Sequence, residues 1–172
     1  VNRFDYGIAE EIGHRQTMED SCAIVQHLNV RALSQASPQH FPQSFFAVYD
    51  GHGGSEASAF LSKTLHVRLA DKLKELSPAI KTSSATGDTQ RLLVEMLKSV
   101  FSATDDEFIR TSEFAQHGST ATTALLVGNW LFCANTGDSR TLLCRDFKPM
   151  PMTTDHKPSR EDEAARIRAA GG

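Results

Sequence analysis

The segment that decides the fold is residues 45–54, which read FFAVYDGHGG. Five apolar residues are followed at once by an acid, a histidine and three glycines. The apolar run predicts a buried strand, which would deliver Asp50 to the end of a sheet with little freedom. Glycines let the backbone approach a ligand closely, although Asp50 and Gly51 alone would also suit a plain turn. Because His52 and two further glycines follow, the segment favours a site over a turn.

Other β-branched, aromatic or apolar runs lie on both sides of this strand and predict further strands. They occupy residues 6–9, 21–27, 120–127, 130–134 and 141–144. Glycine-containing turns separate the last three runs, so these three predict an antiparallel meander.

Two long helices are predicted, because apolar residues recur at three- and four-residue steps over 57–76 and 92–108. Ser159 and Asp162 form a capping pattern for a short third helix, and Gly171 suits its C-terminal stop. Loops are expected over 28–43 and 81–88. These elements predict an α+β fold rather than parallel βαβ units.

The composition is that of one globular domain: 172 residues, 40% apolar and 23% charged. A formal charge of -3, with no block of basic residues, argues against nucleic acid as a partner. Apolar stretches such as 45–49 and 124–127 are far shorter than the about 20 residues of a membrane span.

The three cysteines, Cys22, Cys133 and Cys144, form no C-x-x-C pair and lie in strand-like segments. They are expected to be buried, reduced thiols of an intracellular protein, in the cytoplasm or nucleus. The first residues lack the pattern of a secretory signal, while a targeting segment upstream of Val1 stays an open alternative.

Further acids lie beside predicted strands. Glu19 and Asp20 precede the strand from residue 21, four to five residues after Arg15, and Asp138 follows the strand at 130–134. Taken singly, the first pair suits a solvated edge and Asp138 suits a hairpin turn. Together with Asp50 they are hard oxygen donors, which favour Mg²⁺ or Mn²⁺ over Zn²⁺. Carboxylates with one Arg and one His suit phosphoryl transfer.

Six short motifs, in this order, resemble the metal-dependent serine/threonine protein phosphatases of type 2C. They are Arg15-x-x-Met18-Glu19-Asp20, Tyr49-Asp50-Gly51-His52-Gly53-Gly54, Gly118-Ser119-Thr120-Ala121, Asn135-Thr136-Gly137-Asp138-Ser139-Arg140, Asp155-His156-Lys157-Pro158, and Arg166-Ile167 with Gly171-Gly172. The resemblance covers residues 6–172. It implies an αββα sandwich of two antiparallel sheets flanked by helices, with a binuclear Mn²⁺ or Mg²⁺ site between the sheets. Residues 1–172 would be a single catalytic domain that lacks its C-terminal part.

The resemblance also implies roles for particular residues. Asp50 would bridge two ions, Glu19 and the carbonyl of Gly51 would bind one of them, and Asp20 would orient coordinated water. Arg15 would hold the substrate phosphate. His52 would be the general acid that protonates the leaving Ser or Thr oxygen.

Asp138 matches the acid of a weaker third ion, and Thr120 would lie near that ion. The family's remaining metal-binding aspartates have no match here. The acids after Asp138 lie in other contexts; they are Asp146, Asp155, Glu161, Asp162 and Glu163. We therefore expect this chain, if it is the whole polypeptide, to bind the second ion weakly and to turn over poorly, although its parent domain would be active.

The implied activity is hydrolysis of phosphoserine and phosphothreonine in protein substrates, by direct attack of a hydroxide that bridges the ions. The protein is expected to be a monomer. The alternative is a truncated, weak or inactive relative that acts as a phosphoprotein-binding or regulatory module. The other histidines share no spacing and are expected to be surface or core residues; they include His14, His27, His40, His66 and His117.

Overall fold

A four-stranded antiparallel sheet forms the centre of the protein, in a computed structural model that describes residues 5–34, 42–82 and 86–172. Its strands follow the order β1-β2-β5-β6. Their bounds are β1 (Ser21–Val25), β2 (Gln43–Tyr49), β5 (Ala121–Val127) and β6 (Trp130–Thr136). The predicted strands at 21–27, 45–49, 120–127 and 130–134 are thus present, and each is paired with a neighbour.

The register places one face of β2 in the core. Phe45 and Tyr49 are fully buried, whereas Val48 between them is 48% exposed. This alternation is expected of a strand whose successive side chains point to opposite faces. Tyr49 pairs with Ser21 of β1, and Val48 pairs with Thr122 of β5, so the end of β2 meets the start of both neighbours.

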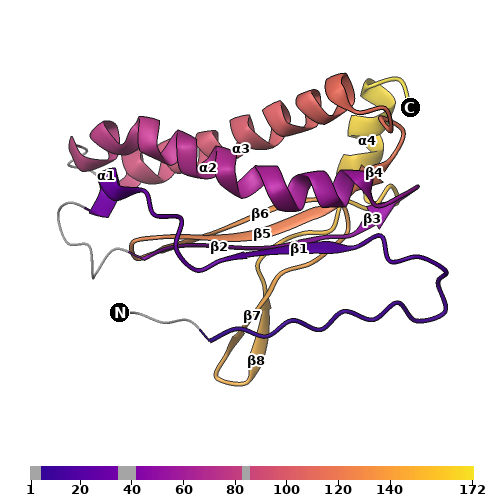
Figure 1. The fold of residues 1–172 in the computed structure, drawn as a ribbon, viewed down its shortest axis with the longest axis horizontal. Coiled ribbons are helices and arrows are strands. Elements are labelled where there is room, and N and C mark those ends of the chain that lie inside the picture. Colours follow the sequence, from indigo (N-terminus) through magenta and orange to yellow (C-terminus); the bar gives the residue numbers. More distant parts are fainter. Residues whose placement is uncertain (1–4, 35–41, 83–85) are drawn as a thin grey trace.

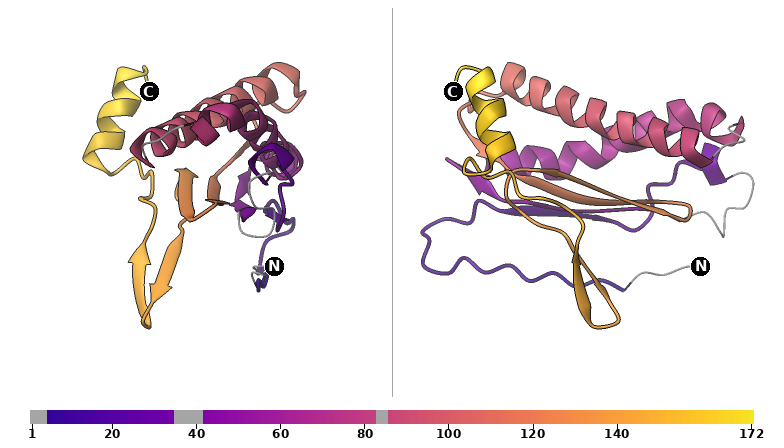
Figure 2. Two further views of the ribbon diagram at one scale, coloured as in Figure 1. Left: turned by 90° about the vertical axis from the view of Figure 1, so that its left-hand side faces the viewer. Right: turned by 180° about the vertical axis from the view of Figure 1, so that it is seen from behind.

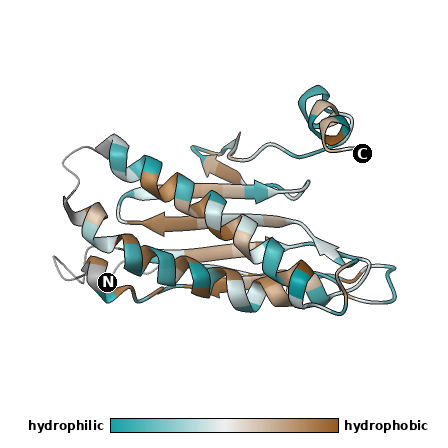
Figure 3. Cartoon of the chain, turned by 90° about the horizontal axis from the view of Figure 1, so that it is seen from above, coloured by the Kyte–Doolittle hydropathy of each residue, from teal (hydrophilic) through white to brown (hydrophobic). Residues whose placement is uncertain are grey.

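Two long helices cover that buried face (Figures 1 and 3). They are α2 (Glu56–Thr82) and α3 (Thr86–Thr111). Their apolar stripes form the core with the sheet, and its fully buried members include Leu65, Leu69, Leu73, Leu93, Leu125 and Val127. Among the helices of the described ranges, none combines the length and the apolar content needed to cross a bilayer.

The remaining elements are short. They are α1 (Arg31–Ser34), β3 (Gly51–His52), β4 (Gly118–Ser119), β7 (Leu142–Arg145), β8 (Lys148–Pro151) and α4 (Glu161–Ala169). β3 pairs with β4, and β7 pairs with β8. Figure 2 shows that the β7–β8 hairpin extends from the sheet on the side opposite to α2 and α3.

The α+β class, with antiparallel sheets flanked by helices, is confirmed as a partial sandwich. The strand predicted at 6–9 is wrong, because these residues are irregular and exposed. The predicted meander is also wrong in its last step: β7 pairs with β8 rather than with β6, after the irregular residues 137–141.

Several smaller predictions need correction. Helix α4 has Arg160, not Ser159, as its N-cap, without a capping side chain, whereas Gly171 has the positive φ of a helix stop. The loop expected at 28–43 contains α1 and the start of β2, and its residues 35–41 lie outside the described ranges. The loop expected at 81–88 falls partly in helices, since α2 runs to Thr82 and α3 begins at Thr86, and its residues 83–85 lie outside the described ranges. Cys144 is exposed, and Cys22 and Cys133 are half-buried.

Candidate metal and phosphate site

The predicted site residues Asp20, Asp50 and Asp138 lie in segments that meet at one end of the sheet. Asp20 directly precedes β1, Asp50 directly follows β2, and Asp138 lies two residues after β6. Because the strands are antiparallel, the start of β1, the end of β2, the start of β5 and the end of β6 are adjacent. Figure 1 shows this end beside β3.

Thr120 fixes the backbone of Asp50 from both sides. The Thr120 N–H donates to the carbonyl of Asp50 (2.8 Å), and the Asp50 N–H donates to the Thr120 hydroxyl (3.1 Å). The same hydroxyl lies 2.6 Å from the hydroxyl of Ser139, which neighbours Asp138. Thr120 is buried, and through these hydrogen bonds it links the Asp50 segment to the loop that contains Asp138.

The carboxylate of Asp50 lies among like charges. Partial desolvation raises its pKa, and the charges of Asp20 and Asp138 raise that pKa further, while His52 lowers it. Asp20 is close enough for a carboxyl–carboxyl hydrogen bond with Asp50. Neighbouring carboxylates of like charge resist joint ionisation, and a cation would relieve the repulsion.

Glu19 reaches the site through its backbone. Its carbonyl accepts a hydrogen bond from the buried Ser58 hydroxyl (2.5 Å), and a Cβ at Gly51 would collide with the same carbonyl oxygen. Glycine is therefore required at 51 for the close approach of these two segments. The half-buried Glu19 side chain accepts a long hydrogen bond from Thr17 (3.4 Å).

Asp138 is partly compensated by a neighbouring cation. The Lys157 ammonium lies 2.5 Å from its carboxylate, and this hydrogen bond and charge lower the pKa of Asp138. The Lys157 segment is held against the loop by the His156 N–H, which donates to the carbonyl of Gly137 (2.9 Å). The Arg140 guanidinium donates two hydrogen bonds, of 2.9 and 2.7 Å, to the carboxylate of Asp155.

Arg15 and His52 are both exposed. Arg15 belongs to the loop before β1, in a turn where its N–H donates to the carbonyl of Ile12 (3.2 Å). The ring of His52 lies directly over Gly118, where a Cβ would collide with its Nε2 atom.

The donor set suits a hard divalent cation in its chemistry, because it offers carboxylate and carbonyl oxygens. The donors are only partly brought together: within the described ranges, no three His, Cys, Asp or Glu side chains form a group that could hold a metal ion. Asp20 and Asp50 form a close pair, and the side chains of Glu19 and Asp138 have other partners.

The sequence alone assigned no role in this region to four residues: Glu56, Ser58, His117 and Lys157. Ser58 and Lys157 contact Glu19 and Asp138, and Glu56 pairs with His117. Lys157 stood in a motif but had no assigned role. No local sequence pattern predicts the Glu56–His117 contact, because the two residues are 61 positions apart in the sequence.

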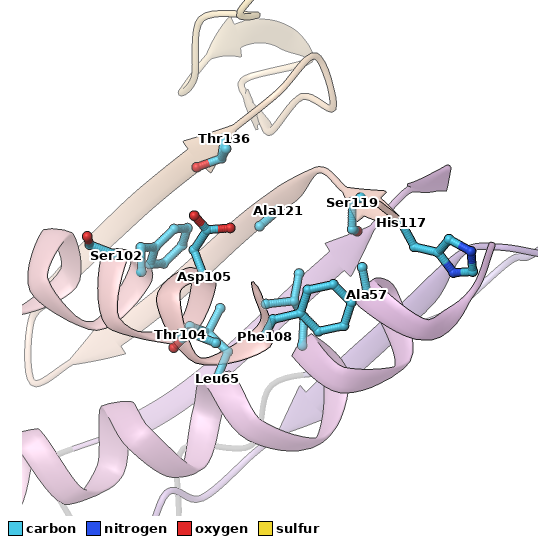
Figure 4. Close-up of a pocket in the computed structure, with 13 residues that line it drawn as sticks. Ala57, Leu65, Ser102, Thr104, Asp105, Phe108, His117, Ser119, Ala121 and Thr136 are labelled. Carbon is cyan, nitrogen blue, oxygen red and sulfur yellow. The ribbon is translucent and has the colours of Figure 1, made fainter. Parts of the chain in front are cut away.

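A cavity of about 280 Å³ opens between α2, α3 and the start of β5 (Figure 4). Apolar side chains such as Leu65 and Phe108 line it, together with Asp105, His117 and Ser119. It borders β4 on the helix side.

Comparisons with known proteins give the family. The sequence model of the family described as Protein phosphatase 2C matches residues 4–172. The chain is 37% identical to "Probable protein phosphatase 2C 75" of Arabidopsis thaliana over 97% of its length, which is 42% of that protein. It is 38% identical to "Protein phosphatase 2C 56" of the same plant, over 97% of the chain and 38% of that protein. The chain thus spans about two fifths of the length of these relatives.

Solved structures show the same fold. The "Structure of a C.elegans sex determining protein" aligns with a TM-score of 0.66 and 25% identity, over 93% of this chain and 36% of that one. The "Crystal structure of serine-threonine phosphatase 2C from Toxoplasma gondii" aligns with a TM-score of 0.66 and 23% identity, over 94% and 52%. With a family match that runs from residue 4 to residue 172, the chain belongs to the protein phosphatase 2C family.

Proposed function

We propose that the protein is a Mg²⁺- or Mn²⁺-dependent serine/threonine protein phosphatase, and that residues 1–172 carry part of its active site. The observation that carries the proposal is the convergence of Asp20 and Asp50 at one end of the sheet. They flank the paired residues Ser21 and Tyr49, and the charge of Asp20 raises the pKa of Asp50. Among the described residues, no ion pair involves Asp20 or Asp50, whereas Lys157 pairs with Asp138. A divalent cation is the partner that such a pair lacks.

In this proposal Asp50, Asp20, Glu19 and the Gly51 carbonyl would hold Mg²⁺ or Mn²⁺, and Asp138 would serve a weaker third ion near Thr120. Bound ions would supply an activated water for attack on the phosphorus atom. The close approach of Gly51 to Glu19 keeps two of these donors in neighbouring segments.

Arg15 and His52 would act on the substrate. The exposed Arg15 guanidinium can bind two phosphoryl oxygens as a bidentate fork. As the bond from phosphorus to the Ser or Thr oxygen breaks, His52 would donate its proton to that oxygen, so that an alcohol leaves rather than an alkoxide. A proton from solvent then restores His52.

The test is Mn²⁺-dependent hydrolysis of a phosphothreonine peptide and of p-nitrophenyl phosphate by the chain, with Mn²⁺ binding measured by calorimetry. Asp50→Asn should lower hydrolysis by about 100-fold or more, because even groups that only support metal ligands are worth 10–100-fold. Asp71→Asn is the matched control, since Asp71 is exposed on α2 away from the sheet end.

Loss of hydrolysis and of Mn²⁺ binding in Asp50→Asn alone would support the proposal. Phosphopeptide binding without hydrolysis by the unmodified chain would contradict it and would identify a phosphoprotein-binding module instead.

A further inference from the structure

The pair formed by Glu56 and His117 lies beside the candidate active site and has no role in the function proposed above. His117 Nδ1 is 2.6 Å from the Glu56 carboxylate, and the His117 side chain is only 14% exposed. Glu56 is the first residue of α2, and His117 directly precedes β4. The contact therefore ties the start of the helix to the strand that pairs with β3.

The His117 ring fills space that only glycine leaves open. Gly54 has a φ of +142°, and a Cβ there would collide with the ring of His117. Phe114 stacks on the same ring, with centroids 5.1 Å apart and planes 27° apart. The ring is thus held between the glycine segment that follows His52 and the loop before β4; Figure 4 shows it at the edge of the cavity.

Gly118, which follows His117 and is the first residue of β4, supports the ring of His52. In the β3–β4 ladder, Gly51 pairs with Ser119 and His52 pairs with Gly118, and the His52 ring lies on Gly118. Two consecutive residues, His117 and Gly118, therefore contact the two halves of the segment His52-Gly53-Gly54. Fixing His117 fixes the support under the His52 ring.

We propose that Glu56 and His117 form a clasp that positions His52 for proton transfer to the leaving group. They are positioning residues, because neither contacts the carboxylates or the place where a phosphate would bind in the function proposed above. The proposal rests on that function for its catalytic consequence. The contact between Glu56 and His117 exists in the fold without metal or substrate, so its effect on β3 and β4 can be tested without measuring catalysis.

The catalytic test compares two leaving groups. Phosphothreonine needs protonation of its alkoxide, whereas p-nitrophenolate leaves without it. Two variants test the contact: Glu56→Ala, and His117→Phe, which keeps an aromatic ring for Phe114. In both, kcat on a phosphothreonine peptide should fall about tenfold. This is part of the 10²–10⁴-fold rate enhancement that a general acid supplies. KM and the hydrolysis of p-nitrophenyl phosphate should stay within about twofold of the original values, since Arg15 and the carboxylates are untouched.

Conservative and remote variants serve as controls. Glu56→Gln retains an oxygen acceptor for the His117 ring and should keep most of the activity on the peptide. Glu75→Gln removes a comparable carboxylate that contacts Lys72 on the exposed face of α2, and His27→Gln removes an exposed imidazole. Equal losses on both substrates in Glu56→Ala, or no loss on either, would overturn the proposal.

The second test follows amide hydrogen exchange in the chain without metal or substrate. Glu56→Ala should speed exchange in β3 and β4 about tenfold while the amides of β2 and β5 keep their rates, because only the local opening becomes easier. Glu75→Ala should leave all four strands unchanged. If the unmodified chain shows no Mn²⁺-dependent hydrolysis, the proposed function fails, and exchange alone decides the clasp: faster exchange confined to β3 and β4 supports it, and unchanged exchange overturns it.

Discussion

At the residue scale, Gly51 is a position where the fold leaves no room for a side chain. Its missing Cβ is what lets β3 approach the Glu19 carbonyl, and the Ser58 hydroxyl occupies the remaining space. Gly51→Ala should lower the free energy of unfolding by about 1–3 kcal/mol, the usual cost of overpacking. Urea unfolding followed by circular dichroism measures this change.

Gly87→Ala is the control, because a Cβ at Gly87 meets nothing within 4 Å. Gly87 lies in the first turn of α3, where the change should stabilise the helix by up to about 1 kcal/mol. Equal effects at both glycines would contradict the close approach of Gly51 to Glu19.

The acidic pair gives a pH dependence whose sign can be worked out. The pKa of Asp50 is raised in the folded protein, whereas the unfolded chain has the ordinary value near 3.9. Stability is therefore lost as the pH rises through the folded pKa, because ionisation then costs more in the folded state. Without divalent metal, Asp50→Asn should unfold at a higher temperature than the original chain at pH 7, and the difference should vanish below about pH 3.

Thermal unfolding in EDTA across this pH range measures the effect, with Asp71→Asn as the control. A variant that is less stable at neutral pH than the original would show that Asp50 is not repelled by its neighbours.

Residue types and short motifs predict that Asp20 and Asp50 belong to one site, and the pairing of β1 with β2 brings both residues to the same end of the sheet. The sequence patterns could not predict that Asp138 contacts Lys157, or that Glu56 meets His117. Those contacts depend on how loops fold over the sheet end, and the sequence carries no periodic signal for loop geometry.

At the scale of elements, the helices depend on their buried stripes. Leu69 lies in the middle of α2 and is fully buried, whereas Val67 two positions earlier is 48% exposed. Leu69→Ala should cost about 2–5 kcal/mol of unfolding free energy, while Val67→Ala should stay within about 0.5 kcal/mol. Denaturant titration of both variants compares them directly, and similar costs would contradict the packing of α2 on the sheet.

The same periodicity explains which elements could be predicted. The stripes over 57–76 and 92–108 give helices because they match one face of a helix. Strand β8 was missed, since its sequence KPMP contains two prolines, which argue against a strand unless it lies at an edge. Residues 6–9 have the composition of a strand, but in the structure they run along the surface without a ladder, and composition alone cannot reveal a missing partner.

At the scale of the whole molecule, the candidate site exists only because distant segments converge. Antiparallel pairing of β1, β2, β5 and β6 brings together residues near 20, 50, 120 and 138 at one end of the sheet. The sequence indicated the strands, and only the resemblance to a known family indicated how they are joined. The site's stability and the stability of the sheet are consequently linked.

This linkage gives the expectation that Mn²⁺ stabilises the folded chain. An ion that binds only the folded state, at a concentration 100 times its Kd, adds about 2.7 kcal/mol, which corresponds to a rise in Tm of about 5–10 °C for a domain of this size. Asp50→Asn should start from a higher Tm in EDTA and respond little to Mn²⁺, because the variant has lost both the repulsion and the ligand. Asp71→Asn should respond like the original chain.

Titration calorimetry with Mn²⁺ should resolve one tightly bound ion and one weakly bound ion. If the Tm stays unchanged at saturating Mn²⁺, these carboxylates do not form a metal site in this chain.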